Sequence, residues 1–209
     1  MRTWSDDDPK AGLMARKRAQ ITAAAHESFL RDGYAGASVN RIAADAGVSI
    51  KTLYRHFDDK DDLFTAVMLR ACSHGPEVEH VWFDQAPEEG LVEAGVELLS
   101  AVLTPDQVAL YRVVLIEGQR VPAVARAYRE AFLQRRLRVL TDYFARWPEA
   151  LRVRITNPES AAATFNALMT ADLVEHALLG APTPTATAIR ERAERVAEAF
   201  LILVHADVL

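Results

Sequence analysis

The chain has 209 residues, of which 50% are hydrophobic and 25% are charged, and its formal net charge is −5. This composition indicates a soluble, folded protein of one or two domains and argues against a disordered chain. No apolar run reaches the roughly 18 to 20 residues that a membrane span needs, and the N-terminal residues are polar and acidic. Cys72 is the single cysteine. We therefore expect a cytoplasmic protein without signal peptide, membrane anchor or intrachain disulfide.

The charges are distributed unevenly along the chain. Residues 10–57 contain eight Lys or Arg and three Asp or Glu, which gives +5, whereas residues 1–9 carry −2 and residues 58–209 carry −8. A basic segment on a larger acidic body suggests that one small module binds a polyanion. An accidental charge asymmetry is the alternative reading.

Almost every segment repeats its apolar residues with a helical period, and no segment alternates as a strand does. The pattern predicts an all-α protein with an arm at 1–15, a small head at 16–62 and a larger helical bundle at 63–209. The nine expected helices span residues 16–31, 38–46, 49–56, 59–73, 87–103, 105–119, 122–146, 158–180 and 185–206.

Helix boundaries in the head carry recognisable caps. Gly33 is placed to end the first helix, and Gly47 allows a left-handed turn between the second and the third. Ser38, Ser49 and Asp59 are N-cap residues by type and position, and Asp62 lies three residues after Asp59 as in a capping box.

Residues 38–57, "SVNRIAADAGVSIKTLYRHF", have the spacing of a helix-turn-helix. The small residues Ala43 and Gly47 permit a close helix crossing, while Leu53 and Phe57 complete a small core. The second helix then offers Lys51 and other polar side chains to phosphates and base edges of a major groove. A helical hairpin without a DNA role is the alternative, because such look-alikes are common.

The segment 16–64 resembles the DNA-binding domain of the TetR family of bacterial regulators. The resemblance depends on Ala46-Gly47 in the turn, the stretch Thr52-Leu53-Tyr54 with Phe57, and Lys60 followed by acids and Leu63. It implies a nine-helix TetR-like architecture in which residues 16–62 bind DNA and residues 63–209 bind a ligand and dimerise.

The resemblance also assigns roles to single residues. Ser38, Thr52, Tyr54 and Lys60 would bind phosphates, while Lys51 faces the bases and Arg41 lies beside the groove. Family members often carry lysine and then glycine or proline where this chain has Ile50-Lys51, and Ile50 could touch a thymine methyl. His56 could reach a phosphate, pack against the protein or face solvent. The expected DNA-binding residues are Ser38, Arg41, Ser49, Ile50, Lys51, Thr52, Tyr54, Arg55, His56 and Lys60.

Lys60 stands among acids at the start of a helix, where backbone N–H groups favour an anion. Asp59, Asp61 and Asp62 stabilise the same helix end and would repel DNA if they pointed toward it. We therefore expect these three carboxylates to cap the helix and to face away from DNA.

The resemblance implies that the last two long helices form the dimer surface. An alanine-rich helix at 158–180 permits close approach, and the helix at 185–206 carries an apolar stripe. Burial of both helices within one subunit is the alternative. The candidate interface residues are Phe165, Leu168, Ile189, Val196, Phe200, Leu201 and Val204.

Asp172 and His176 lie four residues apart on an apolar stripe, and they need partners if they are buried. They orient a ligand in a cavity or form a satisfied pair across the dimer seam. Aromatic residues at helical spacing also occur in ordinary hydrophobic cores. The aromatic candidates therefore either line a ligand cavity or belong to the core. The candidate ligand residues are Tyr111, Arg112, Tyr128, Phe132, Phe165, Met169, Asp172 and His176.

Cys72, His74, Glu77 and His80 are close in sequence and are residue types that bind zinc. Their spacing matches no established site, so we expect no metal and no cofactor, and nothing in the sequence indicates a reactive Cys72.

These observations predict a transcriptional repressor that a small molecule releases from a palindromic DNA operator, and not an enzyme. Its partners would be double-stranded DNA, a second copy of the chain and an unidentified small-molecule effector. The helix expected at 59–73 belongs to both parts and would couple them. The alternatives are a ligand-blind architectural DNA binder and an all-α enzyme that uses Asp172 and His176.

Overall fold

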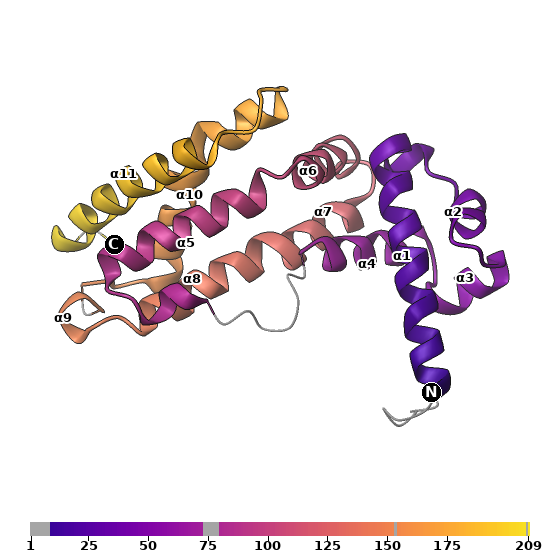
Figure 1. The fold of residues 1–209 in the computed structure, drawn as a ribbon, viewed down its shortest axis with the longest axis horizontal. Helices are drawn as coiled ribbons and strands as arrows, with labels where there is room; N and C mark the ends of the chain where they lie inside the picture. The colour runs from indigo at the N-terminus through magenta and orange to yellow at the C-terminus, as the bar shows by residue number, and fades with distance from the viewer. Residues whose placement is uncertain (1–8, 73–79, 153, 208) are drawn as a thin grey trace. The chain divides into compact units, whose positions relative to one another are not determined.

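The computed structural model describes residues 9–72, 80–152, 154–207 and 209 (Figure 1). Every regular element within these ranges is helical, which confirms the all-α prediction. Contacts divide the chain into a head unit, Met1–Ser73 with Arg112–Ala131, and a body unit, His74–Tyr111 with Phe132–Leu209. The two units are described separately.

The head unit contains the short helices that the sequence predicts. Helix α4 packs against α1 and α7, and α2 packs against α1 and α3. The helices are α1 (Pro9–Gly36), α2 (Val39–Asp45), α3 (Ile50–His56), α4 (Lys60–Cys72), the last residues of α6 (Pro105–Glu117) and α7 (Pro122–Tyr128).

Helix α1 is longer than the sequence pattern predicts. It begins at Pro9 instead of Arg16, so residues 9–15, which were expected in a flexible arm, are helical. Proline is favourable at a helix start because its fixed φ suits the first turn and its missing N–H would have no partner there. Gly33 breaks the helix as expected, with φ 70° and ψ 174°, but a further helical turn continues to Gly36.

The core of the head unit follows the predicted period. Ile21, Ala25 and Phe29 of α1 are fully buried. The Phe29 ring contacts the Phe64 ring of α4 edge to face, with 5.1 Å between centroids, and Tyr34 packs on both rings. These contacts hold α4 against α1.

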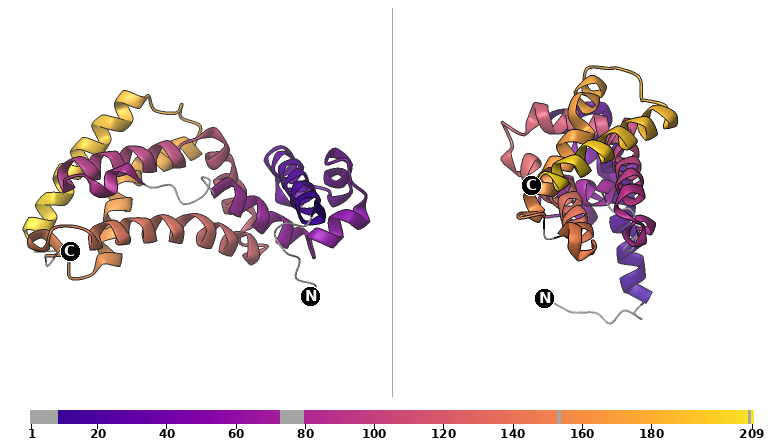
Figure 2. Two further views of the ribbon diagram at one scale, coloured as in Figure 1. Left: turned by 60° about the horizontal axis from the view of Figure 1, so that its bottom comes forward. Right: turned by 90° about the vertical axis from the view of Figure 1, so that its left-hand side faces the viewer.

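The body unit consists of long helices with short connections. Helix α11 packs along α5, while α10 packs against α8 and α5 (Figure 2). The elements are η1 (Val81–Asp84), α5 (Pro87–Val102), the first residues of α6, the end of the π-helical η2 (Arg129–Gln134), α8 (Arg135–Ala145), α9 (Glu149–Arg152), α10 (Pro158–Leu178) and α11 (Ala186–His205).

Two glycines let other elements approach α5 closely. A Cβ on Gly90 would overlap the Tyr143 hydroxyl and lie 2.9 Å from the Trp82 carbonyl oxygen. A Cβ on Gly95 would overlap the flexible end of Met169 and lie 3.1 Å from the Ala193 Cβ. The aromatic core of the unit lies beside the first of these glycines, and its members are Trp82, Phe83, Tyr143, Phe144, Trp147, Phe165 and Phe200.

Each of the nine predicted helices has a counterpart, with two differences besides the earlier start of α1. The helix expected at 122–146 is a helical run from Pro122 to Ala145 that is interrupted by η2. The short elements η1 and α9 were not predicted, because four residues are too few to show a period. Among the described residues, crossing a membrane would take α5 and α6 together, since no helix is by itself long and apolar enough.

Candidate nucleic-acid interface

The turn between α2 and α3 has the geometry that its sequence predicts. Gly47 adopts φ 65°, which is the left-handed region that favours glycine. The Val48 N–H donates to the Ala43 carbonyl at 2.9 Å and closes the turn. Ser49 caps α3, since its Oγ accepts the Thr52 N–H at 3.1 Å and lies 2.9 Å from the Thr52 hydroxyl. Helix α3 is therefore held at its N-terminal end by its own side chains.

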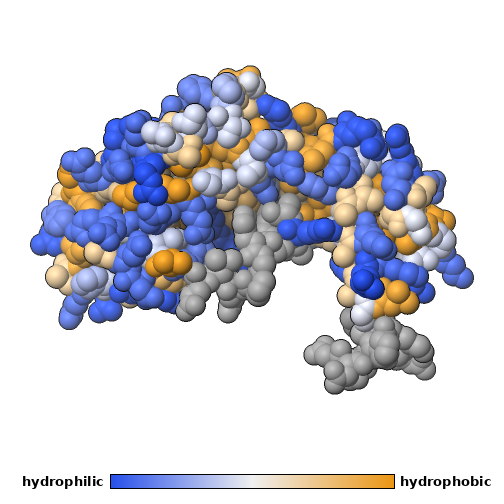
Figure 3. Space-filling model, in the orientation of Figure 1, coloured by the Kyte–Doolittle hydropathy of each residue, from blue (hydrophilic) through white to orange (hydrophobic). Residues whose placement is uncertain are grey.

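Helix α3 is buried on one face and open on the other. Leu53 and the adjacent Phe57 are buried, as expected, and fix the inner face against the head core. The outer face mixes hydrophilic residues with isolated hydrophobic ones, as does the rest of the head surface that is drawn in Figure 3. Its exposed residues are Ile50, Lys51, Tyr54 and Arg55.

Two of the predicted DNA-binding residues belong to α2: Ser38 lies at its N-cap and Arg41 lies within it. Ser38 occupies the N-cap position with an extended backbone, but its side chain makes no capping hydrogen bond. The Ser38 hydroxyl is exposed and remains available to another acceptor or donor. Arg41 is also exposed, and its guanidinium lies 4.0 Å from the Asp45 carboxylate one turn later. An ion pair this exposed is weak, so it does not fix the Arg41 side chain.

Lys60 lies at the N-terminus of α4, where it contacts the end of α1. Its Nζ donates to the Ala35 carbonyl at 3.3 Å and lies 4.7 Å from the centre of the Tyr34 ring. Burial lowers the pKa of Lys60, while the Glu117 carboxylate acts in the opposite direction. The Lys60 ammonium is thus oriented by α1 before any phosphate arrives.

The acidic side chains around Lys60 accept hydrogen bonds within the head unit, as the capping pattern in the sequence suggests. Asp59 caps α4 by accepting the Asp62 N–H at 2.8 Å, and the Asp62 carboxylate accepts the Asp58 N–H at 3.1 Å. Asp61 accepts a hydrogen bond from the Tyr34 hydroxyl. Each of the three carboxylates at 59, 61 and 62 therefore has a donor within the head unit.

Sequence reasoning missed Arg18, which braces the other end of α3. Its Nη1 donates to the His56 carbonyl at 2.5 Å, and its guanidinium lies 4.3 Å from the centre of the Phe57 ring. Burial lowers the pKa of His56, and Arg55, Arg18 and Lys17 lower it further. The basic run at residues 16–18 was the available signal, but its distance of 38 residues from His56 concealed the contact.

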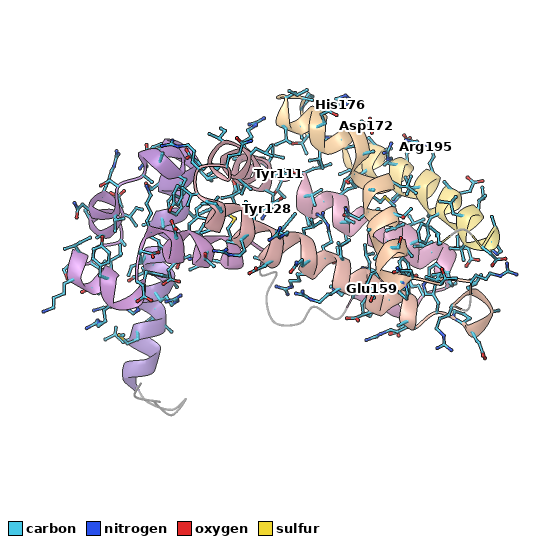
Figure 4. All side chains as sticks on the ribbon, turned by 180° about the vertical axis from the view of Figure 1, so that it is seen from behind. Tyr111, Tyr128, Glu159, Asp172, His176 and Arg195 are labelled. Carbon is cyan, nitrogen blue, oxygen red and sulfur yellow. The ribbon has the colours of Figure 1, made fainter. Side chains whose placement is uncertain are left out.

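The predicted ligand residues do not form a single group. Phe165 and Met169 are fully buried in the core of the body unit. Asp172 and His176 are instead exposed, near the C-terminal end of α10 (Figure 4). The sequence left open whether this acid and histidine are buried, and in the structure both are exposed; Ala171, just before Asp172, interrupts the helix with φ 12°.

Asp172 has a partner that the sequence did not suggest. Its carboxylate lies 3.3 Å from the Arg192 guanidinium of α11 and 4.0 Å from the His176 ring. Arg192 also donates to the Leu168 carbonyl at 2.8 Å, close to the interruption at Ala171. The group thus stabilises a broken helix within one chain.

The other ligand candidates are divided between the two units. Tyr111 and Phe132 belong to the body unit, and Arg112 and Tyr128 belong to the head unit. A groove of about 230 Å³ lies within the head unit between α1 and α4, and none of the predicted ligand residues lines it. Its lining residues are Thr22, Ala23, His26, Glu27, Val67 and Arg70.

Most of the predicted dimer residues lie inside one chain. The apolar stripe of α11 faces α5, so these side chains are covered by their own chain, which is the alternative that the sequence left open. Leu168 and Leu201 are half-buried and remain predictions. The buried residues are Phe165, Ile189, Val196, Phe200 and Val204.

His80 is the one member of the candidate metal group whose side chain the structure describes. Its Nδ1 lies 2.9 Å from the Glu97 carboxylate, which also accepts the Trp82 indole N–H at 2.7 Å. The side chains of Cys72, His74 and Glu77 lie outside the described residues. Within the described part of the chain, no cluster of three His, Cys, Asp or Glu residues is suited to a metal ion.

Two family models match the chain. The model described as "Bacterial regulatory proteins, tetR family" matches residues 21–67, and "AefR-like transcriptional repressor, C-terminal domain" matches residues 89–203. The second match alone covers more than half of the chain. The chain belongs to the TetR family.

Solved structures of TetR-family proteins share this fold. A TetR-family transcriptional regulator from Mesorhizobium loti MAFF303099 superposes with a TM-score of 0.80 at 26% identity, over 91% of this chain and 97% of the other. The flavonoid-responsive regulator FrrA superposes with a TM-score of 0.71 at 27% identity, over 90% of this chain and 96% of the other.

Curated relatives match over a short part of the chain. An HTH-type transcriptional regulator of Staphylococcus aureus (strain USA300) is 45% identical over 53 residues, which are 25% of this chain. The chain spans 29% of the length of that relative. The match to this HTH-type regulator thus covers about a quarter of the chain, while the structural likeness covers most of it.

Proposed function

We propose that this TetR-family protein is a DNA-binding transcriptional repressor in the cytoplasm that reads a palindromic operator as a homodimer and leaves it when a small molecule binds. The observation that carries the proposal is the exposed face of α3. Lys51, Tyr54 and Arg55 project from a helix whose N-terminus is capped by Ser49 and whose C-terminus is braced by Arg18. A rigid helix with an exposed polar face suits the major groove.

The residues around α3 support phosphate contacts on both sides of this face. The hydroxyl pair of Ser49 and Thr52 lies at the N-terminal end of α3, and Lys60 lies at the start of α4. Phosphate contacts fix the register of a protein on DNA, whereas base contacts determine sequence preference. We assign phosphate contacts to Ser38, Ser49, Thr52, Tyr54 and Lys60, and base contacts to Ile50 and Lys51.

A single α3 reads too few base pairs for useful specificity, so the proposal needs a dimer. We place the dimer surface on the exposed faces of α10 and α11 and not on their buried stripes. Ala163 and Ala167 of α10 are exposed, and Ile202 of α11 is 62% exposed although it is a large apolar residue. Small residues permit two helices to approach closely, and an exposed isoleucine gains by burial.

Light scattering tests this surface. Ile202→Glu should convert the dimer to a monomer, because it places a charge in an apolar seam. Val81→Glu is the matched control, since Val81 is 80% exposed on η1 outside the two helices. A dimer that survives Ile202→Glu would contradict the assignment.

The effector is the least defined part of the proposal. One structural relative is a flavonoid-responsive regulator at 27% identity, so flat aromatic phenols are the class to test first. Tyr111 and Phe132 of the body unit remain proposed ligand contacts. A ligand that binds the DNA-free form more tightly must weaken DNA binding by the same free energy.

The experiment that tests the function is a binding titration with purified protein and DNA from beside its own gene. The proposal predicts a saturable complex that resists competition by arbitrary DNA and dissociates when an effector is added. Binding of equal strength to both DNAs would instead favour a ligand-blind architectural protein. Membership of the TetR family favours a regulator over an enzyme.

A further inference from the structure

We propose that Arg192 of α11 holds α10 in a kinked form at Ala171, and that α10 becomes a continuous helix when Arg192 lets go. The contacts of Arg192 with the Leu168 carbonyl and the Asp172 carboxylate are called the latch below. All members of the latch belong to α10 and α11 of the body unit. The regulatory part of the inference rests on the proposed function, because α10 carries part of the proposed dimer surface.

The sequence around the kink favours a continuous helix. Residues 167–178, "ALMTADLVEHAL", contain neither glycine nor proline. Alanine, the residue at the kink, is the best helix former. Sharp kinks ordinarily need a proline, a glycine, a π-bulge or a side chain that inserts into the backbone hydrogen bonds. We therefore looked for a side chain that inserts at Ala171.

Two side chains donate to backbone carbonyls next to the kink. In a continuous α-helix, the Leu168 carbonyl accepts the N–H that lies four residues later. Here the Arg192 Nη2 donates to that carbonyl at 2.8 Å. The Thr170 hydroxyl donates to the Asn166 carbonyl at 2.8 Å, a contact that often bends helices. Arg192 is the stronger influence, because a charged donor makes the stronger hydrogen bond.

Asp172, the first residue after the kink, holds the same guanidinium. Its carboxylate lies 3.3 Å from the Arg192 Nη2 and 4.0 Å from the His176 ring. The Arg192 side chain is 22% exposed and that of Asp172 is 55% exposed, so water and salt reach the ion pair from the Asp172 side. The latch thus combines a part-buried contact to a carbonyl with an ion pair that is easily weakened.

These contacts give α10 two alternative forms. In the kinked form, Arg192 supplies a charged hydrogen bond to the Leu168 carbonyl. In the continuous form, the backbone supplies that hydrogen bond and Ala171 adopts the helical conformation that it prefers. Each form replaces the hydrogen bond that the other loses, so a change in the contacts of α10 or α11 can select between them.

Figure 4 labels residues on both sides of the kink. Glu159 lies in the first turn of α10, while Asp172 and His176 lie in the part that follows the kink. Opening of the latch would move this last part relative to α11. Because α10 and α11 carry the proposed dimer surface, the geometry of the dimer would change with it. The spacing of two reading helices must match the spacing of their half-sites, so the latch would alter DNA affinity without touching DNA.

Hydrogen exchange at the Asp172 amide, measured by nuclear magnetic resonance on the full-length protein, tests the latch. This N–H donates to the Leu168 carbonyl only in the continuous form, so it should exchange rapidly in wild type. Arg192→Met keeps an apolar stem and removes every donor, so it should slow this exchange by about tenfold or more. Arg195→Met makes the same change at an exposed position on α11 (Figure 4) and should leave the exchange rate as in wild type.

A distance between two spin labels supplies a second measurement. Glu159→Cys and Glu175→Cys place labels at exposed positions on either side of the kink, in a Cys72→Ser background. Dilution with unlabelled protein restricts the measured distances to one chain. A continuous α10 separates these positions by about 24 Å along its axis. Arg192→Met should shift the distance distribution to that of a continuous helix without broadening it.

The outcomes separate this inference from the proposed function. Slow exchange at Asp172 in wild type, or unchanged or faster exchange in Arg192→Met, would overturn the latch, and so would a broadened distance distribution. If the latch opens as expected, fluorescence anisotropy should show that affinity for DNA from beside the protein's own gene changes by about fivefold or more. An unchanged affinity would overturn the regulatory part. If wild-type protein binds no DNA, the proposed function fails, while exchange at Asp172 still decides the latch.

Discussion

Lys60 and Tyr34 lie against each other, with the Lys60 Nζ 4.7 Å from the centre of the Tyr34 ring. The same ammonium donates to the Ala35 carbonyl, and the Tyr34 hydroxyl donates to Asp61. Three contacts therefore join the end of α1 to the start of α4. Lys60 contributes a charge for DNA in this arrangement, whereas the Tyr34 hydroxyl contributes to the fold.

Tyr34→Phe should separate these two contributions. It removes the hydrogen bond to Asp61 but keeps the ring beneath Lys60, so the free energy of unfolding should fall by about 1 to 2 kcal/mol. DNA affinity should change little. Lys60→Gln should do the reverse, with a smaller slope of log affinity against log salt and a small effect on stability. Urea unfolding and anisotropy measure both quantities, and a loss of DNA affinity in Tyr34→Phe equal to that in Lys60→Gln would refute the division.

Ser49 caps α3 and is also a proposed phosphate contact. An aspartate at this position can cap the helix but cannot bind a phosphate. Aspartate caps helices as well as serine does, so Ser49→Asp should keep the stability of the head unit within about 0.5 kcal/mol. Its negative charge should weaken DNA binding by about tenfold or more. Ser49→Ala should lose about 1 kcal/mol of stability because the Thr52 N–H loses its acceptor. Wild-type DNA affinity in Ser49→Asp would contradict the phosphate contact.

Local signals in the sequence predicted the head unit well. The left-handed turn at Gly47 was predicted from the residue type alone. Its φ of 65° lies in the region that favours glycine. The caps at Ser49 and Asp59 depend on neighbours three residues away, so they were also readable. The contact between Arg18 and His56 spans 38 residues and has no local pattern, so it was missed.

The body unit shows why an apolar stripe does not identify its own partner. The α11 stripe was read as an intersubunit surface, but Phe200 and Val204 are fully buried in their own chain. A period of 3.6 residues shows that one helix face is covered, and it does not show what covers it. The interruption at Ala171 was likewise invisible, because alanine is the best helix former and gives no sign of a break.

The two close-packed glycines of α5 should respond differently to alanine. Alanine favours a helix over glycine by about 1 kcal/mol, so the sign depends on the space at each site. At Gly95 the obstacles are the flexible end of Met169 and, at 3.1 Å, the Ala193 Cβ, which can give by a few tenths of an ångström, so Gly95→Ala should be neutral within about 1 kcal/mol. At Gly90 the obstacles are the Tyr143 hydroxyl and the Trp82 carbonyl, so Gly90→Ala should destabilise by about 2 to 3 kcal/mol.

A double variant checks the cause at Gly90. Tyr143→Phe removes the oxygen that the new methyl group would overlap, so Gly90→Ala should cost less in that background, by about 1 kcal/mol. Denaturant midpoints of the four proteins give the comparison. Equal costs of Gly90→Ala in both backgrounds would show that the Trp82 carbonyl alone decides the effect.

Tyr143 makes the stability of the body unit depend on alkaline pH. Burial raises the pKa of Tyr143 from its ordinary 10 to about 12, and the nearby Trp147 indole opposes the rise. Because the pKa is higher in the folded state, the contribution of Tyr143 is complete below pH 10 and is lost as pH rises toward 12. The loss is at most about 2 to 3 kcal/mol. Urea unfolding at pH 9 and pH 11 should show a smaller difference in Tyr143→Phe than in wild type.

Selection of bound DNA from a random pool tests the central claim most directly, with wild-type protein and Lys51→Ala compared on the selected sequence. The account predicts enrichment of a palindrome with two half-sites. It also predicts that Lys51→Ala loses about 1 to 3 kcal/mol of the preference for that palindrome over arbitrary DNA, while its affinity for arbitrary DNA changes much less. A pool that shows no enriched sequence, or an enriched palindrome that wild type and Lys51→Ala prefer equally, would contradict the assignment of α3 as the reading helix.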